Sequence, residues 1–505
     1  MTRYRHLITD DNRKWWTLGA MCFALFMVML DNTVVNVALP SIQRDLHAQI
    51  SALEWVINGY TLTFAVLIAT GGRLGDIFGR RLMFMAGVII FAITSATAGI
   101  AQDPAMLIGS RAIQGIGAAL MMPATLSIIT HTFPAAERGR AIGTWAGVSA
   151  LALSIGPVVG GFLTEYVSWR AIFFINLPVA AAAVAVTFFA VRESRDETVD
   201  RHVDYPGVVA LTASLTAIVL ALIEGNSWGW GSPSIIGLLV GGAIGLAIFV
   251  AIELRVSSPM VEFALFKTRQ FIGSNLVAFI ITFAMMGTFF FMAIYMQDIL
   301  GYGALEAGIR FLPTTMVIAV IAPISGRLAD RLGPATPMSA GLAVLAVSMF
   351  MFAGIDTSTT YSGLLVPFIL MGVGIALTMS PMSTAAMNAV SVQKSGVASG
   401  VLQMSRMIGA SVGVAATGAI FQSQLGSGFD PAQLAAAPEQ ARATFIDALS
   451  SAMLLAAIVV VAGLVVSLTL VRGARAKRVD ARGAAEESAA AVPEATVAED
   501  VAAAA

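Results

Sequence analysis

The chain has 505 residues, 57% of them hydrophobic and 12% charged, with a formal net charge of -1. Soluble domains contain roughly 45–50% apolar and about 25% charged residues, so this composition indicates an integral membrane protein and no nucleic-acid surface. The single cysteine, Cys22, lies in the first apolar segment, which excludes an intramolecular disulfide and a thiolate metal site.

Apolar segments of about 20 residues, the length that crosses a bilayer, recur along the whole chain. The basic start is followed by an apolar run too long for a signal-peptide core, so we expect it to be an uncleaved first helix. The first seven helices are predicted near 15–39, 52–71, 82–101, 104–128, 140–164, 170–191 and 205–224. The second seven are predicted near 233–252, 271–297, 307–326, 335–355, 361–383, 396–422 and 448–471.

The distribution of Lys and Arg predicts the orientation, because cytoplasmic loops carry the excess of positive charge. Of the 29 basic residues, 23 lie in the amino terminus, the even-numbered loops and the tail, and two lie within helices. The odd-numbered loops hold only Arg44, Arg170, Arg310 and Arg442. This pattern favours fourteen helices in the cell membrane with both termini cytoplasmic. The tail from Gly473 lacks aromatic residues and is expected to be disordered.

The pattern Gly-Arg-Leu-x-Asp-x-x-Gly occurs twice, starting at Gly72 and again 254 residues later at Gly326. This repeat indicates an internal duplication with the same cytoplasmic loop in each half. Glycines of the fifth and thirteenth helices repeat at nearly the same offset, so helices one to six correspond to nine to fourteen. The predicted units are an amino-terminal six-helix bundle (1–200), an inserted helix pair that links the bundles (201–258), a carboxy-terminal six-helix bundle (259–472) and a tail (473–505).

Five motifs in order resemble the major facilitator superfamily, and within it the fourteen-helix drug:proton antiporters. They are LDNTVVNVALPSI at 30–42, GGRLGDIFGRR at 71–81, LIGSRAIQGIGAA at 107–119, SIGPVVGG at 154–161 and WRAIFFINLP at 169–178. The resemblance implies an all-α integral membrane protein with the major facilitator fold, in which two inserted helices accompany the two bundles. It also implies antiport of protons against hydrophobic compounds.

Asp31 is the candidate for proton coupling, because a carboxylate inside an apolar helix is costly and is usually kept for ion or substrate handling. Arg111 is predicted at a similar depth and is its expected partner. The structural alternative for Asp31 is a permanent ion pair with Arg111, or polar contacts with Asn32, Thr33 and Asn36. For Arg111 the alternative is a packing arginine that bonds backbone carbonyls.

Two further groups are expected to control conformation. Aspartates and arginines of the repeated motif are predicted to latch the cytoplasmic side, a solvated turn being the alternative. Small residues of the fifth helix are predicted to form a bending or sealing contact between bundles, with Gly409 and Gly413 as the matching pair, or else to be ordinary packing. The gate residues are Gly72, Arg73, Asp76, Gly79, Arg80, Arg81 and Asp330, and the antiporter-motif residues are Gly156, Pro157, Gly160 and Gly161.

An adaptable apolar substrate cavity is expected around the ninth helix, where Met and Phe residues are dense. The candidate lining residues are Asn36, Met285, Met286, Phe289 and Arg406. Arg406 would repel cationic substrates if it faced the path without a partner. Because other superfamily branches share the first motifs, an importer or a uniporter is the alternative within transport.

A membrane enzyme, an ATP-driven pump and a non-transport receptor are weaker hypotheses. No lysine stands in a phosphate-binding Gly-Lys-Ser/Thr loop, and the histidines lack metalloprotease spacing, so no cofactor or metal is expected. Gly-Asn-Ser-Trp-Gly at 225–229 lacks the context of a hydrolase nucleophile. The expected partners are protons, hydrophobic small molecules and membrane lipids. A periplasmic partner stays open, with the outer loop at 422–447 as its only large contact segment.

Overall fold

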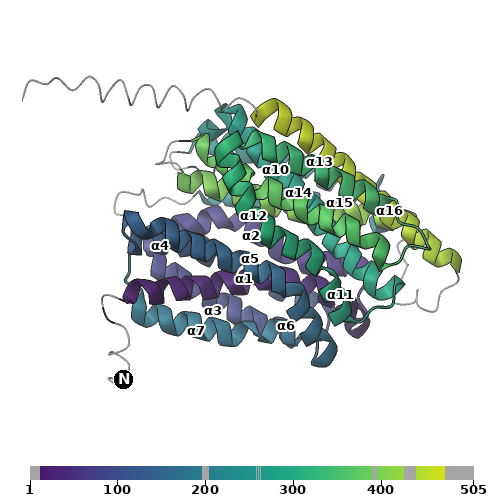
Figure 1. Cartoon of the computed structure of the whole chain (residues 1–505), viewed down its shortest axis with the longest axis horizontal. Helices are drawn as coiled ribbons and strands as arrows, with labels where there is room; N and C mark the ends of the chain where they lie inside the picture. The colour runs from purple at the N-terminus through teal and green to yellow at the C-terminus, as the bar shows by residue number, and fades with distance from the viewer. Residues whose placement is uncertain are drawn as a thin grey trace, which may run out of the picture.

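The computed structural model describes residues 9, 12–195, 204–256, 259, 261, 263–390, 395–425 and 439–471, and every regular element in these ranges is a helix (Figure 1). The prediction of an all-α membrane fold is confirmed. The tail predicted at 473–505 and most of the outer loop predicted between the last two helices lie outside the described residues.

The helices follow the predicted segments and are mostly longer. The first group is α1 (Arg13–Leu46), α2 (Ile50–Phe78), α3 (Arg80–Gly99), α4 (Pro104–Thr132), α5 (Ala135–Tyr166), α6 (Ala171–Phe174) and α7 (Asn176–Ala190). Next come α8 (Tyr205–Trp228) and α9 (Pro233–Glu253). The last group is α10 (Arg269–Ile294), α11 (Ala304–Arg310), α12 (Leu312–Leu332), α13 (Ala335–Ala353), α14 (Tyr361–Asn388), α15 (Ser395–Leu425) and α16 (Glu439–Val466).

Within the described ranges, 13 helical spans are long and apolar enough to cross a membrane. Two of them are interrupted helices, α6 with α7 and α11 with α12. The 32-residue α5 is also of membrane-crossing length and corresponds to the predicted fifth helix. These elements match the fourteen predicted segments one for one.

Two of the predicted helices are broken near one end, and proline accounts for both breaks. The sixth predicted helix divides at Ile175, just before Pro178, which has no N–H to donate to the carbonyl four residues earlier. The tenth divides at Phe311, and Pro313 opens the next helix. Both breaks leave a short helix on the side of the molecule opposite the amino terminus.

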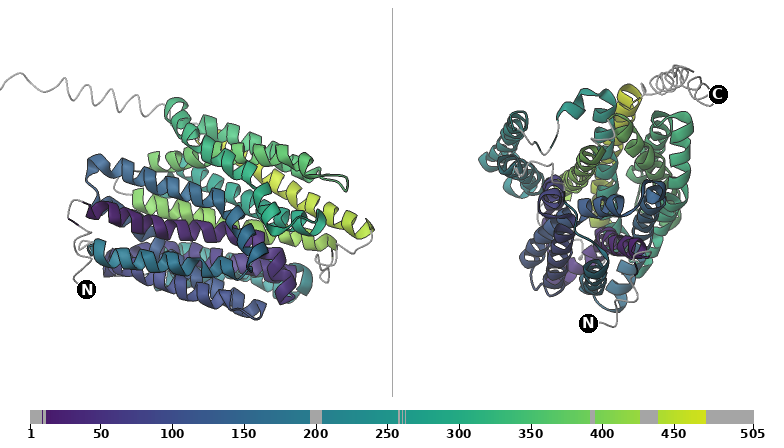
Figure 2. Two further views of the ribbon diagram at one scale, coloured as in Figure 1. Left: turned by 60° about the horizontal axis from the view of Figure 1, so that its bottom comes forward. Right: turned by 90° about the vertical axis from the view of Figure 1, so that its left-hand side faces the viewer.

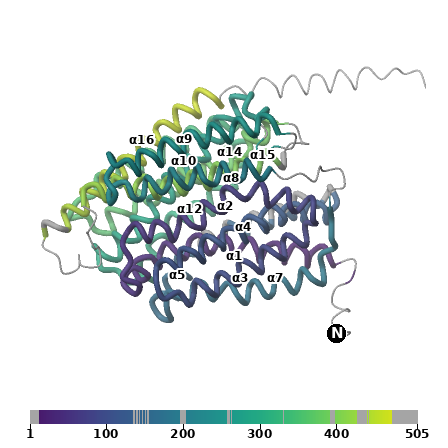
Figure 3. The backbone as a smooth tube through the Cα atoms, turned by 180° about the vertical axis from the view of Figure 1, so that it is seen from behind, coloured from purple at the N-terminus to yellow at the C-terminus, as the bar shows by residue number. Residues whose placement is uncertain are grey.

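The helices form two bundles with a peripheral pair. Helices α1–α7 pack mainly on one another and are called the first bundle. Helices α10 and α12–α16 also pack mainly on one another and, together with α11, are called the second bundle, although α11 itself packs mainly on α5 of the first bundle. Helices α8 and α9 pack on each other, and α8 also contacts α2 and α15, so the pair lies beside the seam between the bundles. Figure 2 gives this arrangement from the side and end-on, and Figure 3 shows α8 near α2 and α15 from behind.

Contacts between the bundles are made by α5 with α11 and α12, by α2 with α15, and by α1 with α10. Helix α11 lies at the end of the molecule opposite the amino terminus, which we call the distal side. In Figure 1 the second bundle slants away from the first toward the end that carries the amino terminus, called here the terminal side. The distal ends of the bundles are therefore the ends that meet.

Candidate functional site

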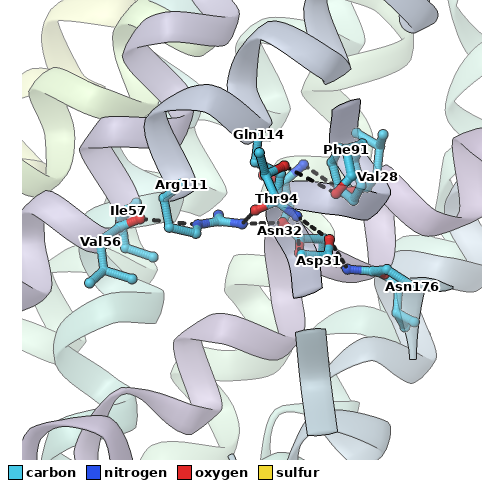
Figure 4. Close-up of polar contacts among 12 residues, drawn as sticks. Val28, Asp31, Asn32, Val56, Ile57, Phe91, Thr94, Arg111, Gln114 and Asn176 are labelled. Carbon is cyan, nitrogen blue, oxygen red and sulfur yellow. Dashed lines mark hydrogen bonds and ion pairs between the residues drawn. The ribbon is translucent and has the colours of Figure 1, made fainter. Parts of the chain in front are cut away.

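Asp31 and Arg111 form a buried ion pair in the first bundle (Figure 4). Asp31 lies midway along α1 and is 0% exposed, and Arg111 comes from α4 and is 1% exposed. The distance between Arg111 Nη1 and Asp31 Oδ2 is 2.5 Å. The two side chains thus meet at one depth, as the helix positions predicted.

Three further polar side chains complete the surroundings of the carboxylate. Gln114 Nε2 and Asn176 Nδ2 each donate to Asp31 Oδ1 at 3.2 Å, and each also donates to Ser95 Oγ, at 2.8 Å and 3.2 Å. Both oxygens of Asp31 therefore accept hydrogen bonds while Arg111 supplies the opposite charge. This arrangement fits the ionised carboxylate, because a buried charge needs both a counter-charge and hydrogen bonds.

Arg111 has stabilising contacts that do not involve Asp31. Its Nε donates to the backbone carbonyl of Val56 at 3.2 Å, and its Nη1 donates to Gln114 Oε1 at 2.6 Å. The guanidinium carbon lies 4.3 Å from the ring centre of Tyr60 and 5.9 Å from that of Phe173. Cation–π and carbonyl contacts of this kind hold a guanidinium in place even when its carboxylate partner is neutral.

The polar residues that follow Asp31 in α1 bond to their own helix. Asn32, Thr33 and Asn36 each donate to a backbone carbonyl three or four residues earlier, at 2.9–3.0 Å. Of the two structural alternatives considered for Asp31, the ion pair is thus the one that the structure contains. Arg111 also makes the contact with a backbone carbonyl that was expected as its structural alternative. Arg111 is therefore both the ion-pair partner of Asp31 and an arginine that packs two helices together.

The glycine motif of α5 packs on both bundles. A Cβ atom at Gly160 would lie 2.8 Å from Val34 Cα of α1, and Gly156 faces Thr33 of the same helix. A Cβ at Gly161 would lie 2.5 Å from the carbonyl oxygen of Ala304 in α11. Because ordinary van der Waals contacts are longer, only glycine allows backbones to approach this closely. The motif therefore packs α5 against α1 and also seals it against the second bundle.

Gly409 and Gly413, expected as the matching contact, pack within the second bundle. They face the backbone of α10 at Phe279 and Phe283, where a Cβ at Gly413 would lie 2.6 Å from Phe283 Cα. This is the counterpart of the α5–α1 packing. The expected role as a contact between bundles is wrong for these two positions, because their face of α15 is covered by α10 and not by the first bundle.

Hydrogen bonds between the bundles gather toward the distal side. They use polar groups from the distal parts of α1, α2, α5 and α15, from the π-helical turn η2 (Tyr295–Ile299) that follows α10, and from the first turn of α11. The bonds are Gln297 Nε2 to Val37 O (2.8 Å), Ser411 Oγ to Asn58 Oδ1 (2.6 Å), Gln422 Nε2 to Glu54 Oε1 (3.0 Å) and Leu305 N to Glu165 Oε2 (2.8 Å). Together they reinforce the glycine seal.

The repeated motif is helical, which corrects the prediction of a loop. Gly72, Arg73 and Asp76 belong to the last two turns of α2, and only Gly79, with φ of 119°, forms the turn. In the second copy, Asp330 belongs to α12 and Gly333, with φ of 81°, follows the helix. The helix continues through the charged residues of the motif, and the chain turns only at the glycine whose φ is positive. The side chain of Asp330 lies outside the described residues.

The first copy of the motif makes the ion pair expected of it within its own half. Asp76 Oδ1 accepts from Arg80 Nη2 at 2.9 Å. The N-terminus of α3, which follows the motif, is bound by Glu193, whose carboxylate accepts from the backbone N–H groups of Arg81 (3.0 Å) and Leu82 (3.1 Å). Arg81 in turn donates to the carbonyl of residue 188 at 3.0 Å.

The candidate cavity residues differ in exposure. Met286 and Phe289 are 9% and 8% exposed, and Phe289 packs edge-on against Phe311 at 5.2 Å between ring centres. Met285 is half-buried. Arg406 Nη1 donates to Gln403 Oε1 at 3.3 Å.

Asn36 and Arg406 carry unsatisfied buried atoms. Asn36 Oδ1 and Arg406 Nε have no hydrogen-bond partner within the described ranges. Both belong to helices that line the contact between the bundles, α1 and α15.

Sequence reasoning missed Ser95, Gln114, Asn176 and Glu54. Gln114 and Asn176 lie inside motifs that were recognised, but an amide in an apolar helix gives a weaker signal than a charge. Glu54 satisfies the rule that selected Asp31, a carboxylate within an apolar segment, and that signal was sufficient to find it.

Two bundles of membrane-crossing helices, with a buried ion pair inside one of them and hydrogen bonds across the seam between them, have the architecture of a multi-pass membrane transporter. The chain belongs to the Major Facilitator Superfamily, whose profile matches residues 21–414. The prediction of this family from the five motifs is confirmed.

The chain is 35% identical over 420 residues to the tetracenomycin C resistance and export protein of Streptomyces glaucescens, covering 83% of this chain and 78% of the relative. It is 34% identical over 424 residues to the multidrug resistance protein Stp of Mycobacterium tuberculosis, covering 84% and 79%. A bacterial homologue of the human lysosomal transporter Spinster, solved in an inward-facing and unoccupied conformation, has the same fold with a TM-score of 0.66 and 18% identity, covering 91% of this chain and 98% of that one.

Proposed function

We propose that this protein is a proton-coupled antiporter that exports hydrophobic or amphipathic compounds across the cell membrane by alternating access. The observation that carries the proposal is the buried Asp31–Arg111 pair, a titratable group inside the membrane-spanning part of a chain whose relatives are named as drug and antibiotic exporters. An intramembrane carboxylate with a counter-charge is the arrangement that proton-driven transporters use for coupling.

Proton binding at Asp31 would release Arg111 from its ion pair. The neutral acid no longer holds the guanidinium electrostatically, and Arg111 keeps its contacts with the Val56 carbonyl and the Tyr60 ring. The pairs Gln114–Ser95 and Asn176–Ser95 link α4 and α7 to α3. A change in the charge of Asp31 would therefore alter hydrogen bonds that join four helices of the first bundle, α1, α3, α4 and α7. This gives protonation a route to the packing of that bundle.

In alternating access, the distal contact between the bundles and the motif on the terminal side would close alternately. We take both termini to be cytoplasmic, as the distribution of Lys and Arg predicts, so that a closed distal seal corresponds to an inward-facing state. Opening to the outside requires Gly161 to separate from Ala304 and the bond between Ser411 and Asn58 to break. We propose that Asp76, with its arginines, then closes the cytoplasmic side as a latch.

Substrates are proposed to bind between the bundles near Asn36, Met285, Met286, Phe289 and Arg406. Methionine and phenylalanine offer adaptable apolar surface, which suits compounds of varied shape. The proposed units are 1–200 and 259–472 as moving bundles, with 201–258 as a peripheral linker, since α8 contacts both α2 and α15 at their seam.

Efflux from cells tests the proposal. Cells that express the protein are loaded with a lipophilic fluorescent dye, and export is followed with and without a protonophore; cells with an empty vector give the background. We expect export above background that stops when the proton gradient collapses. Export that continues at the same rate would contradict proton coupling, and accumulation above background would favour the importer instead.

A further inference from the structure

Glu54 is a second carboxylate buried at the centre of a contact between the bundles. It lies in the second turn of α2 and is 0% exposed. Its Oε1 accepts from Gln422 Nε2 of α15 at 3.0 Å. The room for the carboxyl group comes from Gly418 of α15, where any Cβ atom would collide with it. The side chain therefore crosses the seam between the bundles and does not face lipid.

The contacts of Glu54 fit a neutral acid better than an anion. Its Oε2 is buried and has no hydrogen-bond partner among the described residues. The charged group that acts on it from α8 is Glu224, which has the same sign. An anion with one unsolvated oxygen and a like charge nearby is disfavoured, since a buried charge loses its hydration and here gains no counter-charge in return.

Ion pairs already engage the nearest charged groups of α1, α3 and α4, which also contact α2. These pairs are Arg111 of α4 with Asp31, Arg80 of α3 with Asp76, and two from α1, Asp45 with Arg170 and Arg44 with Asp298. Helix α15 offers Glu54 the uncharged amide of Gln422, whereas its charged residue Arg406 lies about 18 Å along the helix from Gly418, the residue that faces Glu54. The Glu54 environment thus differs from that of Asp31, which has a guanidinium at 2.5 Å and two amide donors.

We infer that Glu54 is a proton-binding site of the distal gate, loaded with a proton when α2 and α15 come together and emptied when they separate. The inference rests on the proposed antiport function. Separation of the helices would also break the bond between Ser411 and Asn58, one turn further along the same seam, and would admit water to the carboxyl group. In water the acid ionises and releases its proton; closure then requires a proton to be taken up again.

Proton binding at Glu54 and closure of the seam are thermodynamically linked, so the protonation of this side chain controls the gate. Because the closed seam binds the proton more tightly than the open one, a higher proton concentration must favour the closed seam by the same factor. One proton changes the ratio of closed to open molecules by up to tenfold per pH unit. Protons on the distal side would then promote the return from outward-facing to inward-facing transporters.

The test is a distance measurement between the bundles on the distal side. Spin labels are placed on the exposed residues Gln102, between α3 and α4, and Thr357, between α13 and α14, after Cys22 is replaced by serine. Full-length protein in lipid is measured between about pH 6 and pH 9. For wild type we expect the short distance to dominate at low pH and a longer distance to gain population as the pH rises.

Two glutamine variants separate Glu54 from other interfacial carboxylates. Glu54→Gln mimics the protonated acid, so we expect the short distance to persist across the pH range. The matched control is Glu165→Gln, since Glu165 also bridges the seam but is exposed to solvent; it is expected to keep the wild-type pH response. A wild-type response in Glu54→Gln would overturn the assignment, and so would a wild type without any pH response.

A second variant covers the case in which Glu54→Gln does not fold. Gln422→Leu keeps the carboxyl group and removes its hydrogen-bond donor, so the midpoint of the distance change is expected to shift; an unchanged midpoint would overturn the assignment. Proton-driven dye transport is measured on the same wild-type preparation. If the wild type shows no proton-driven dye transport, the proposed antiport function is contradicted. If the wild type transports normally but the distance in Glu54→Gln still responds to pH, only the assignment of Glu54 as the gate site is contradicted.

Discussion

Replacement of Asp31 by asparagine should destabilise the protein strongly although the two side chains have nearly the same shape. The change leaves Arg111, 1% exposed, with a buried charge and no counter-ion. Removing one partner of a buried ion pair typically costs about 3–5 kcal/mol. The Val56 carbonyl at 3.2 Å and the Tyr60 ring at 4.3 Å still contact the guanidinium, so we expect a loss at the lower end, about 3 kcal/mol.

A double-mutant cycle measures this coupling directly. Arg111→Gln should be destabilised by a similar amount because it leaves the Asp31 carboxylate unpaired, whereas the double variant removes both charges and should recover most of the loss. Denaturant unfolding of the purified protein in detergent micelles, followed by tryptophan fluorescence, gives the four free energies. Additive losses in the double variant would refute the reasoning, because independent sites show no coupling energy.

The same variants separate stability from transport. The double variant is expected to be stable and yet inactive in proton-driven export, since no titratable group remains at the site. If it exported dye at the wild-type rate, the ion pair would be a structural element only.

Three further changes test the seal, the latch and the cavity. Gly161→Ala should push α5 away from Ala304 and raise the population of the long distance between the distal spin labels, whereas Gly147→Ala on the same helix, with nothing within 4 Å, should not. Asp76→Asn breaks a half-exposed ion pair and should cost under about 1 kcal/mol in unfolding free energy, yet slow dye export severalfold; an unchanged export rate would remove the latch role. Arg406→Gln should improve export of cationic over neutral dyes by up to about 30-fold, because a unit charge about 8 Å away contributes about 2 kcal/mol at an effective dielectric constant of 20; an unchanged preference would place Arg406 off the path.

Much of the fold was predictable because every segment that crosses the bilayer needs about 20 predominantly apolar residues. The breaks at Ile175 and Phe311 were not predicted, although each precedes a proline that prevents a continuous hydrogen-bond ladder. The repeated motif was taken for a loop because of its charges. In the structure its Arg and Asp extend the helix beyond the apolar stretch, and only the glycine with positive φ turns the chain.

The candidate site was partly predictable for a related reason. Asp31 and Arg111 could be matched by their depth in the membrane, because the rise per residue of an α-helix is fixed and the position in the sequence therefore gives the depth. Asn176 and Ser95 could not, since their approach to Asp31 depends on how α7 and α3 rotate about their axes, which hydropathy does not specify. The environment of Glu54 depends on α15, more than 350 residues away in sequence, and no local pattern reports that packing.

Transport by purified protein in liposomes under an imposed pH gradient tests proton coupling at Asp31 most directly. Wild type and Asp31→Asn are compared for dye movement driven by the gradient and for exchange of labelled against unlabelled dye without a gradient. We expect Asp31→Asn to keep exchange and to lose the response to the gradient. Gradient-driven transport at the wild-type rate in this variant would contradict the proposal that Asp31 carries the coupled proton.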